Sequence, residues 1–296
     1  MAIESLLAVK NLSVSYGGSQ AIDNVSFDVN GDEIVGIVGE SGSGKTTLLR
    51  SIISLLEKNG RITGGSVTFD GTDMVSLSDK ARSRIAGNEI SMIFQNSERS
   101  LDAVKTIGSQ MVECIRTHQK MRRSDAETLG KETLSRFGFE DIGQVWKSYP
   151  FALSGGMCQR AAIAMAIVNQ PRLLLADEPT GSLDVTVQNQ TVKTLVSLRN
   201  EMHTSILIVT HNMGVVAHMA DLVGVMYKGR MVEWGRRDEV LFEPKHPYTV
   251  SLLSAVPGFD KKFADVILFD NEKYRIENHK IYYSDTHWSL ETEKYE

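Results

Sequence analysis

Gly39-Glu40-Ser41-Gly42-Ser43-Gly44-Lys45-Thr46-Thr47 is the stretch of the chain that decides the fold. It matches the phosphate-loop pattern G-x-x-x-x-G-K-[ST] at every required position. A short apolar run over 33–38 precedes it and is typical of a buried strand. Apolar residues at helical spacing follow it over 45–56. We therefore expect the loop to join the end of a strand to the start of a helix.

The residue types of this loop suit an anionic ligand. Its glycines let the backbone turn N–H groups toward a phosphate, and the N-terminus of the following helix adds partial positive charge. We expect Lys45 to reach the β- and γ-phosphates of a nucleotide and the Thr46 hydroxyl to bind Mg²⁺. A chance glycine-rich turn is the alternative, and the flanking strand and helix argue against it.

Composition limits the remaining possibilities. The 296 residues carry a formal net charge of −5 without a basic tail or stripe, which argues against a general nucleic-acid binder. Cys114 and Cys158 are too few for a disulfide framework and indicate a reducing, cytoplasmic setting. We expect no secretory signal at residues 1–5 and no apolar run long enough to cross a bilayer. Work at a membrane would then depend on partner proteins.

The pattern of apolar residues favours an α/β protein with a parallel sheet covered on both faces. Two alternating runs ahead of the loop predict an antiparallel sheet, and a charged, helical pattern from Ile107 predicts an insertion between core strands. The predicted strands are 6–15, 21–29, 33–38, 64–71, 90–95, 172–177, 205–210, 222–227 and 230–234, with a helix over 185–200.

An aspartate and a glutamate follow four apolar residues at the end of the run 173–178. Asp177 at the carboxyl end of a parallel strand lies where ligands bind in such sheets, and it can hold Mg²⁺. Glu178 is then placed to orient or deprotonate a water that attacks the γ-phosphate. A strand-terminating acid pair at a surface turn is the alternative, which the nearby phosphate loop makes the weaker interpretation.

Two further stretches belong with these residues. His211 directly follows the predicted strand 205–210, and no other histidine ends a predicted core strand. Ser154, Gly155 and Gly156 open a predicted helix, which gives a second exposed helix N-terminus suited to an anion. The alternative for His211 is a strand-end histidine bonded to the backbone. Only that structural interpretation applies to the remaining histidines, which are His118, His203, His218, His246, His279 and His287.

Together these residues resemble the ATP-binding cassette of ABC transporters, over roughly residues 5–257. The resemblance implies a P-loop NTPase (RecA-like) core with an N-terminal antiparallel β subdomain and a helical insertion. It also implies that ATP and Mg²⁺ bind and that the protein is an ATPase. Residues 39–46 are similar to the Walker A loop, and 173–178 are similar to Walker B with its catalytic glutamate.

The resemblance also implies roles for single residues. Gln95 matches the Q-loop residue, which touches Mg²⁺ and the transmembrane partner, and His211 matches the switch histidine. Tyr16 matches the aromatic residue that stacks on adenine, with a core tyrosine as the alternative. The segment 182–184 matches the D-loop. The segment 153–157 matches the signature motif, which in this family faces the Walker A loop of another cassette and so explains the second anion site.

The segment 244–257 resembles the tail of the dipeptide, oligopeptide and nickel importer subfamily, as do Met157 and the stretch 92–95. Many members continue into a cysteine-rich segment that can hold an iron–sulfur cluster. Residues 258–296 contain no cysteine, so such a cluster lacks ligands here.

The same terminal residues predict a small, separate β add-on. Its predicted strands are 266–269, 273–276 and 280–284, the last two forming a hairpin around 277–279. We interpret His279 and His287 as solvent-exposed polar residues rather than a metal site. Truncation after Pro257 is expected to leave ATP binding intact, because every residue assigned to the nucleotide precedes it.

The resemblance implies an ATP-binding domain over 1–257, with the helical insertion at about 96–167, and a C-terminal extension over 258–296. It implies the ATP-hydrolysing subunit of a bacterial-type importer of peptides, nickel or metal chelates, on the cytoplasmic face of the membrane. The implied partners are a second, identical or different ATPase subunit, transmembrane permease subunits and, indirectly, an extracellular substrate-binding protein, with no nucleic acid.

Two other functions stay open at this point. An exporter-type ABC ATPase would have the same chemistry, and the tail over 246–257 argues against it. A soluble ABC protein in DNA repair or translation usually has two cassettes or a long coiled coil. The sequence between Gln95 and Ser154 is too short for such a coiled coil.

Overall fold

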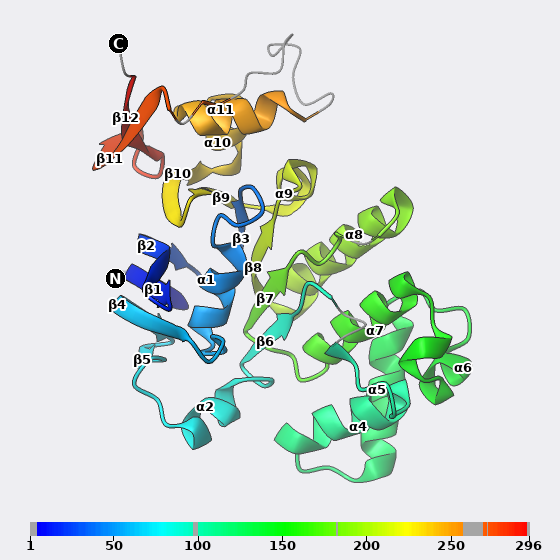
Figure 1. Cartoon of the computed structure of the whole chain (residues 1–296). Helices are drawn as coiled ribbons and strands as arrows, with labels where there is room; N and C mark the ends of the chain where they lie inside the picture. Colours follow the sequence, from blue (N-terminus) through cyan, green and yellow to red (C-terminus); the bar gives the residue numbers. More distant parts are fainter. Residues whose placement is uncertain (1–4, 97–99, 182, 257–268, 271, 295–296) are drawn as a thin grey trace. The chain divides into compact units, whose positions relative to one another are not determined.

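The computed structural model describes residues 5–96, 100–181, 183–256, 269–270 and 272–294 (Figure 1). Two compact units make up the chain. The first contains Met1–Val75 and Ile208–Glu296, and the second contains Ser76–Leu207. Strand β8 (Ser205–Thr210) runs across the boundary between them, and all of its residues are buried.

A four-stranded antiparallel sheet in the first unit has the order β2-β1-β4-β5. The apolar residues of β1 point inward, because Leu7, Val9, Leu12 and Val14 are fully buried between more exposed neighbours. This confirms the antiparallel β subdomain expected from the sequence. Its strands are β1 (Leu7–Tyr16), β2 (Ser19–Val29), β4 (Gly60–Phe69) and β5 (Thr72–Asp73).

The other strands of the first unit run in the order β11-β12-β10-β9-β3. Strand β3 is parallel to β9, whereas β10 is antiparallel to both β9 and β12. Every residue of β3 is buried, as its continuous apolar run predicts. These strands are β3 (Ile34–Val38), β9 (Leu222–Tyr227), β10 (Arg230–Arg236), β11 (Tyr274–Tyr282) and β12 (Trp288–Lys294). The helices are α1 (Lys45–Ile52), α9 (Met213–Met219), α10 (Arg237–Phe242) and α11 (Pro247–Ser254).

The C-terminal β add-on is present, but its predicted arrangement is wrong in two respects. The predicted hairpin over 273–284 is one strand, β11, with an irregular register between Ile276 and Lys280. Its true partner is β12, which pairs on its other side with β10 and so continues the cassette's own sheet (Figure 1). The predicted strand at 266–269 lies, apart from Phe269, outside the described residues.

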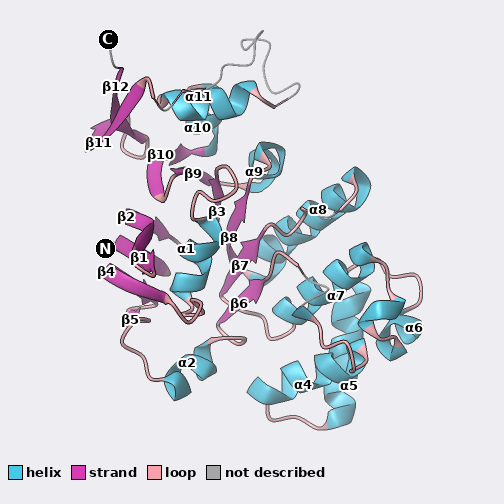
Figure 2. Ribbon diagram, in the orientation of Figure 1, coloured by secondary structure: helices cyan, strands magenta, loops and turns pink. Residues whose placement is uncertain are grey.

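The second unit contains a parallel pair of strands and most of the helices (Figure 2). Strand β6 (Ile90–Ile93) pairs with β7 (Leu173–Asp177), with Ile90 opposite Leu173. Helices fill the sequence between these two strands, as an insertion predicts. The helices of the unit are α2 (Asp79–Ile85), α4 (Ile107–His118), α5 (Arg123–Ser135), α6 (Ile142–Lys147), the 3₁₀ turn η1 (Pro150–Ala152), α7 (Gly155–Ile167) and α8 (Val185–Met202).

Trp146 of α6 is the side chain around which three helices of the insertion pack. A Cβ added to Gly108 of α4 would lie 2.3 Å from its indole ring, and one added to Gly130 of α5 would lie 2.8 Å from it. Both helices approach the ring at positions where only glycine fits. Within the described part of the chain, no helix has both the length and the apolar character needed to span a bilayer.

Candidate nucleotide site

The phosphate loop lies between β3 and α1, as its sequence predicts, and two of its glycines are required by geometry. A Cβ on Gly39 would sit 2.2 Å from the carbonyl oxygen of Met226, so only glycine allows β9 this close. Gly44 has φ +103° directly before the first turn of α1. The loop therefore needs glycine for its close approach at one end and for its left-handed backbone at the other.

Lys45 is buried inside the loop, with 7% of its surface exposed. Its ammonium group donates to the carbonyl oxygens of Gly39 at 2.7 Å and Glu40 at 2.8 Å. The Ser43 hydroxyl lies 3.4 Å from the same nitrogen. These bonds hold the cation over the loop, where an anionic ligand would meet it.

The first turn of α1 lacks, within the described residues, the side-chain cap that α7, α8 and α9 have. Among the described residues no side chain caps it, because the N-cap residue is Gly44. In contrast, Ser154 caps α7, Asp184 caps α8 and Asn212 caps α9, each with its own side chain. The amide groups at the start of α1 are thus the donors suited to an anion, and this cradle fits the phosphates of a nucleotide. The half-buried Thr46 hydroxyl lies in the same turn, where it fits Mg²⁺ held by those phosphates.

Three contacts from distant segments anchor the loop within the first unit. The Gly229 amide, in the turn between β9 and β10, donates to the Ser43 carbonyl at 3.0 Å. Gly39 packs against the backbone of Met226. The Glu40 amide donates to the hydroxyl of Tyr248 in α11 at 3.1 Å. Tyr248 was not among the predicted site residues, because its motif was interpreted only as a family mark.

Tyr16 and His211 are the other predicted site residues of the first unit. Tyr16 ends β1 and is half-buried, and its ring lies against Gly60, where a Cβ would come within 2.5 Å. One face of the ring is thus held by the sheet. His211 is exposed directly after β8, as its position in the sequence predicts.

The acid pair lies at the end of β7 in the second unit. Asp177 is 2% exposed, and Glu178 is 8% exposed. Glu178 also has φ +47°, a left-handed conformation that few non-glycine residues adopt. The Gly181 amide donates to the Glu178 carbonyl at 3.1 Å and closes this turn.

Gln95 is exposed just beyond β6 in the same unit. Because β6 is parallel to β7 and Ile93 pairs with Ala176, Asp177 ends β7 at the same edge of the strand pair at which Gln95 follows β6. The strand pair thus places two of the three residues predicted to hold Mg²⁺ at one edge.

The predicted signature motif starts α7, as expected. The Ser154 hydroxyl accepts a hydrogen bond from the Met157 amide at 3.3 Å, Gly155 is exposed and Gly156 is half-buried. One turn further on, the Gln159 side chain donates to the Pro179 carbonyl at 2.7 Å and is buried. This bond, which the sequence did not indicate, fixes α7 to the turn that holds Glu178. In the predicted D-loop, Ser182 lies outside the described residues.

His287 is the clear error among the predicted residues. It is 3% exposed rather than solvent-exposed, and its Nε2 lies 2.8 Å from Oε1 of Glu233, which is fully buried. His279 is exposed, as predicted. Across the described residues, no three histidine, cysteine, aspartate or glutamate side chains gather closely enough to hold a metal ion.

Comparison with known proteins identifies the family of the chain. Residues 22–181 match the family model described as "ABC transporter", and residues 232–280 match "Oligopeptide/dipeptide transporter, C-terminal region". The chain is 42% identical over 273 residues to the dipeptide transport ATP-binding protein DppD of Bacillus subtilis (strain 168), covering 90% of this chain and 82% of that protein. It is 40% identical over 266 residues to the oligopeptide transport ATP-binding protein OppD of Salmonella typhimurium, covering 88% and 79%.

Among solved structures, a dimeric ATP-binding cassette in a post-hydrolysis state, bound to ADP and Pi, has a TM-score of 0.71. It is 26% identical to this chain and covers 78% of it and 98% of itself. The fold and the phosphate loop define a P-loop ATPase cassette, as the sequence predicts. The chain belongs to the ABC transporter family, and it carries the ATPase domain of that family, which binds ATP.

Proposed function

We propose that this protein is the ATP-hydrolysing subunit of a peptide importer. The observation that carries the proposal is the pairing of an ABC ATPase domain with the C-terminal region of oligopeptide and dipeptide transporters. The relatives described above are named for dipeptide and oligopeptide transport, and these names favour peptides over nickel or metal chelates as the cargo.

The first unit supplies the groups that bind the nucleotide. Lys45 and the amides at the start of α1 bind the phosphates, and Tyr16 stacks on the adenine. The other residues of the loop that contribute to this cradle are Gly39, Glu40, Ser41, Gly42, Ser43, Gly44, Thr46 and Thr47.

The second unit supplies most of the hydrolytic groups. Mg²⁺, held by Thr46, Gln95 and Asp177, would supply charge neutralisation at the phosphates. Glu178 accepts the proton of the attacking water or orients it, and His211 of the first unit contacts the γ-phosphate side of the site. The strained, buried backbone of Glu178 supports this role, because such conformations concentrate at functional sites.

The proposed partners follow from the same residues. A second ATPase subunit receives Ser154, Gly155 and Gly156 at its own nucleotide, in keeping with the dimeric cassette of the solved structure. Transmembrane permease subunits contact the helical insertion and Gln95, which places this subunit on the cytoplasmic face of the membrane. An extracellular substrate-binding protein delivers the peptide to those permeases.

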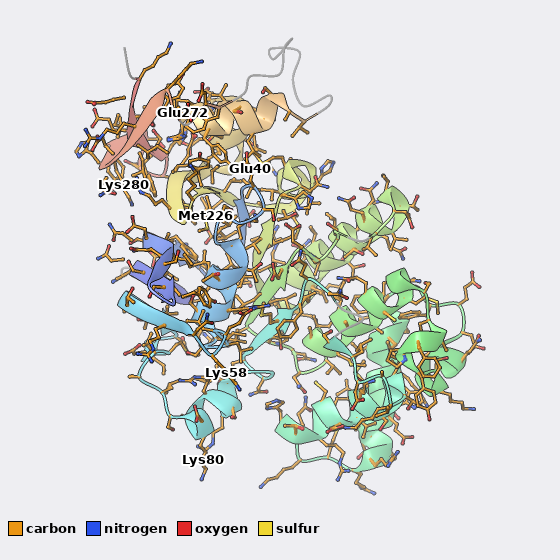
Figure 3. The ribbon with its side chains drawn as sticks, in the orientation of Figure 1. Glu40, Lys58, Lys80, Met226, Glu272 and Lys280 are labelled. Carbon is orange, nitrogen blue, oxygen red and sulfur yellow. The ribbon has the colours of Figure 1, made fainter. Side chains whose placement is uncertain are left out.

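Replacement of Lys45 tests the nucleotide site. Lys45→Ala removes the buried cation, so the dissociation constant for ATP should rise roughly tenfold or more and hydrolysis should be lost. Lys80→Ala is the control, because Lys80 is an exposed lysine on α2 (Figure 3). Equal ATP affinity in the two variants, measured by titration, would contradict the assignment of the loop.

Uptake tests the cargo and the class of transporter. In a strain that lacks this subunit, restored expression should recover uptake of labelled dipeptides or oligopeptides, whereas the Lys45→Ala variant should not. Recovery of nickel uptake alone would contradict peptides as the cargo. Capture of ribosomes or DNA instead of membrane permeases would favour a soluble ABC protein.

A further inference from the structure

The hydroxyl of Tyr248 reaches the phosphate loop from 208 residues away in sequence. It accepts the hydrogen bond of the Glu40 amide, the second residue of the loop, at 3.1 Å. Tyr248 is 1% exposed and is among the largest fully buried side chains of the protein. The hydroxyl of a buried tyrosine normally makes a hydrogen bond. Here its partner is a backbone amide of the phosphate loop.

Aromatic rings on several sides fix the ring of Tyr248. Its centroid lies 4.4 Å from that of Tyr227, at the end of β9, and 5.7 Å from that of Phe269 in an edge-on contact. Phe269 in turn stacks on Tyr274 of β11 at 5.2 Å. Burial raises the pKa of Tyr248 far above its usual range, so the hydroxyl keeps its proton at physiological pH.

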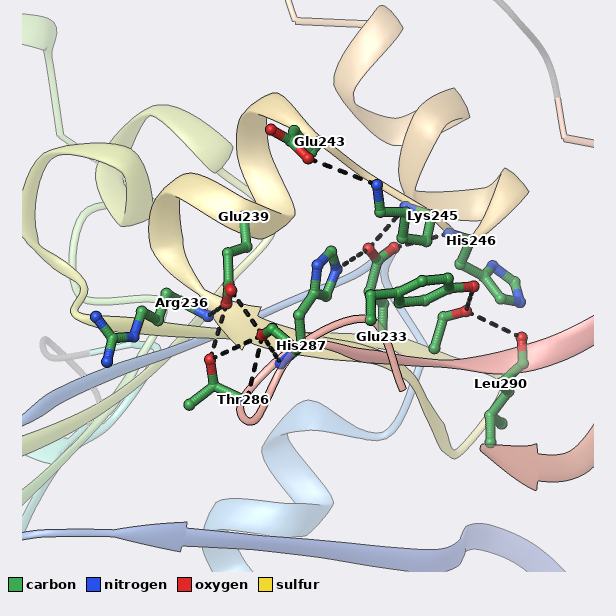
Figure 4. A network of polar contacts seen from close by, with 12 residues as sticks. Glu233, Arg236, Glu239, Glu243, Lys245, His246, Thr286, His287 and Leu290 are labelled. Carbon is green, nitrogen blue, oxygen red and sulfur yellow. Dashed lines mark hydrogen bonds and ion pairs between the residues drawn. The ribbon is translucent and has the colours of Figure 1, made fainter. Parts of the chain in front are cut away.

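A buried carboxylate, that of Glu233, holds the start of α11 (Figure 4). Tyr248 belongs to this helix. Glu233 of β10 accepts hydrogen bonds from the amides of Lys245 at 2.8 Å and His246 at 3.0 Å. His246 then caps α11, because its Nδ1 accepts the Tyr248 amide at 3.1 Å. Glu233 therefore sets where α11 begins.

The same carboxylate also bonds the C-terminal hairpin. Oε1 of Glu233 lies 2.8 Å from Nε2 of His287, which directly precedes β12. A continuous set of contacts thus runs from the hairpin through Glu233 and the start of α11 to the phosphate loop, all within the first unit.

We propose that Tyr248 is a positioning residue of the phosphate loop: its hydroxyl fixes the Glu40 amide, and Glu233 with His287 fixes Tyr248. The inference rests on the proposed function, in which this loop binds ATP. The bond holds the backbone at the loop's entrance in its binding conformation, so less ordering is needed when the phosphates arrive. Without the bond, the loop must become ordered when ATP binds, and the free energy that this ordering costs lowers the affinity for ATP.

Tyr248→Phe is the direct test, because it removes only the hydroxyl and keeps the aromatic packing. We expect the dissociation constant for ATP to rise about three- to tenfold, the effect of one hydrogen bond. The Glu40 amide should also exchange its hydrogen faster in the nucleotide-free protein, a readout that does not involve activity. Near-native ATP affinity together with unchanged exchange at Glu40 would overturn the proposal.

Tyr283→Phe is the matched control. Its hydroxyl lies 3.0 Å from the Ser289 hydroxyl, so the variant loses a tyrosine hydroxyl bond in the C-terminal hairpin, keeps the ring, and changes no bond to the loop. It should bind ATP as the unmodified protein does and should leave exchange at Glu40 unchanged. Equal losses in both variants would indicate general destabilisation and contradict a positioning role for Tyr248.

His287→Ala tests whether the C-terminal hairpin helps to position the phosphate loop. It also provides a second test if the Tyr248→Phe variant folds poorly. It keeps the Tyr248 hydroxyl but removes the bond to Glu233, so exchange at Glu40 should rise by less than in Tyr248→Phe. Unchanged exchange would show that the hairpin does not act on the loop. Failure of the proposed function itself is distinguishable, because then the unmodified protein would not bind ATP or Lys45→Ala would bind it equally well.

Discussion

Glu178 combines three properties that rarely occur together in one acidic residue. It is buried, it follows directly on a core strand, and its backbone is left-handed at φ +47°. Such a backbone costs on the order of 1–3 kcal/mol for a non-glycine residue. The Gly181 amide and the Gln159 side chain bind the carbonyl groups of Glu178 and Pro179 and so hold this turn in place.

Replacement of this carboxylate separates binding from hydrolysis. Glu178→Gln keeps the size and most of the contacts of the side chain but removes the proton acceptor, so hydrolysis should fall about a hundredfold or more while ATP still binds. With ATP the variant should accumulate as a closed dimer, measured by gel filtration. Glu140→Gln, at an exposed acid, is the control. Near-normal phosphate release from Glu178→Gln would contradict the assignment of Glu178.

Among single residues, the sequence predicts those site residues that a short local motif identifies. The spacing of the loop identifies Lys45 and Thr46, and a strand followed by acids identifies Asp177 and Glu178. Tyr248 escaped prediction because its function depends on a contact between residues 208 positions apart. No local pattern encodes which backbone group a buried hydroxyl will meet.

The residue that caps α11, His246, is a histidine whose titration should be visible in the free energy of unfolding. His246 is fully buried, and burial, with a smaller repulsion from Arg230, lowers its pKa from 6.5 to about 4. The unfolded chain therefore binds a proton between pH 6.5 and 4 that the folded protein does not. Stability must rise with pH across that window and be lost as pH falls through it.

We expect this histidine to contribute a loss of about 3 kcal/mol in unfolding free energy between pH 6.5 and pH 4. His246→Asn offers a matched comparison, because asparagine can also cap a helix but does not titrate. The difference between the two proteins, measured by urea denaturation at several pH values, isolates His246 from other titrating groups. Parallel pH profiles would show that folding leaves the pKa of His246 unchanged, which would contradict the prediction.

Among the elements, continuous apolar runs predicted β3, β7 and β8 well, because strands buried on both faces need apolar residues on both faces. The C-terminal hairpin was predicted wrongly because β11 is irregular between Ile276 and Lys280 and so resembles two strands with a turn. The Arg230 guanidinium stabilises this irregularity by donating to the carbonyl oxygens of Ile276 at 2.9 Å and Glu277 at 2.6 Å. That support comes from β10, a distant part of the sequence.

For the whole molecule, the attached hairpin changes the expected result of truncation. The sequence alone predicts that removing residues after Pro257 leaves ATP binding intact. The structure shows that these residues pair with β10, bond Glu233 and pack Phe269 on Tyr248. Truncation also exposes the edge of β10, and an exposed strand edge can pair with strands of other chains.

We now expect truncation after Pro257 to lower the thermal midpoint by roughly 5 °C or more and to weaken ATP binding severalfold. Thermal denaturation and ATP titration of the truncated protein measure the two effects. Truncation after Lys294, which keeps all of β12, is the control and should behave as the full chain does. A truncated protein with unchanged ATP affinity would restore the original prediction that the tail is independent of nucleotide binding.

The bond between Glu40 and Tyr248 also sets an order of events during synthesis. A ribosome completes the phosphate loop long before it reaches Tyr248, and it reaches His287 later still. Because domains generally fold as units while the chain is being made, the loop must wait for its last restraints. A newly made cassette therefore reaches its full affinity for ATP only after the residues around Tyr248 and His287 have been synthesised.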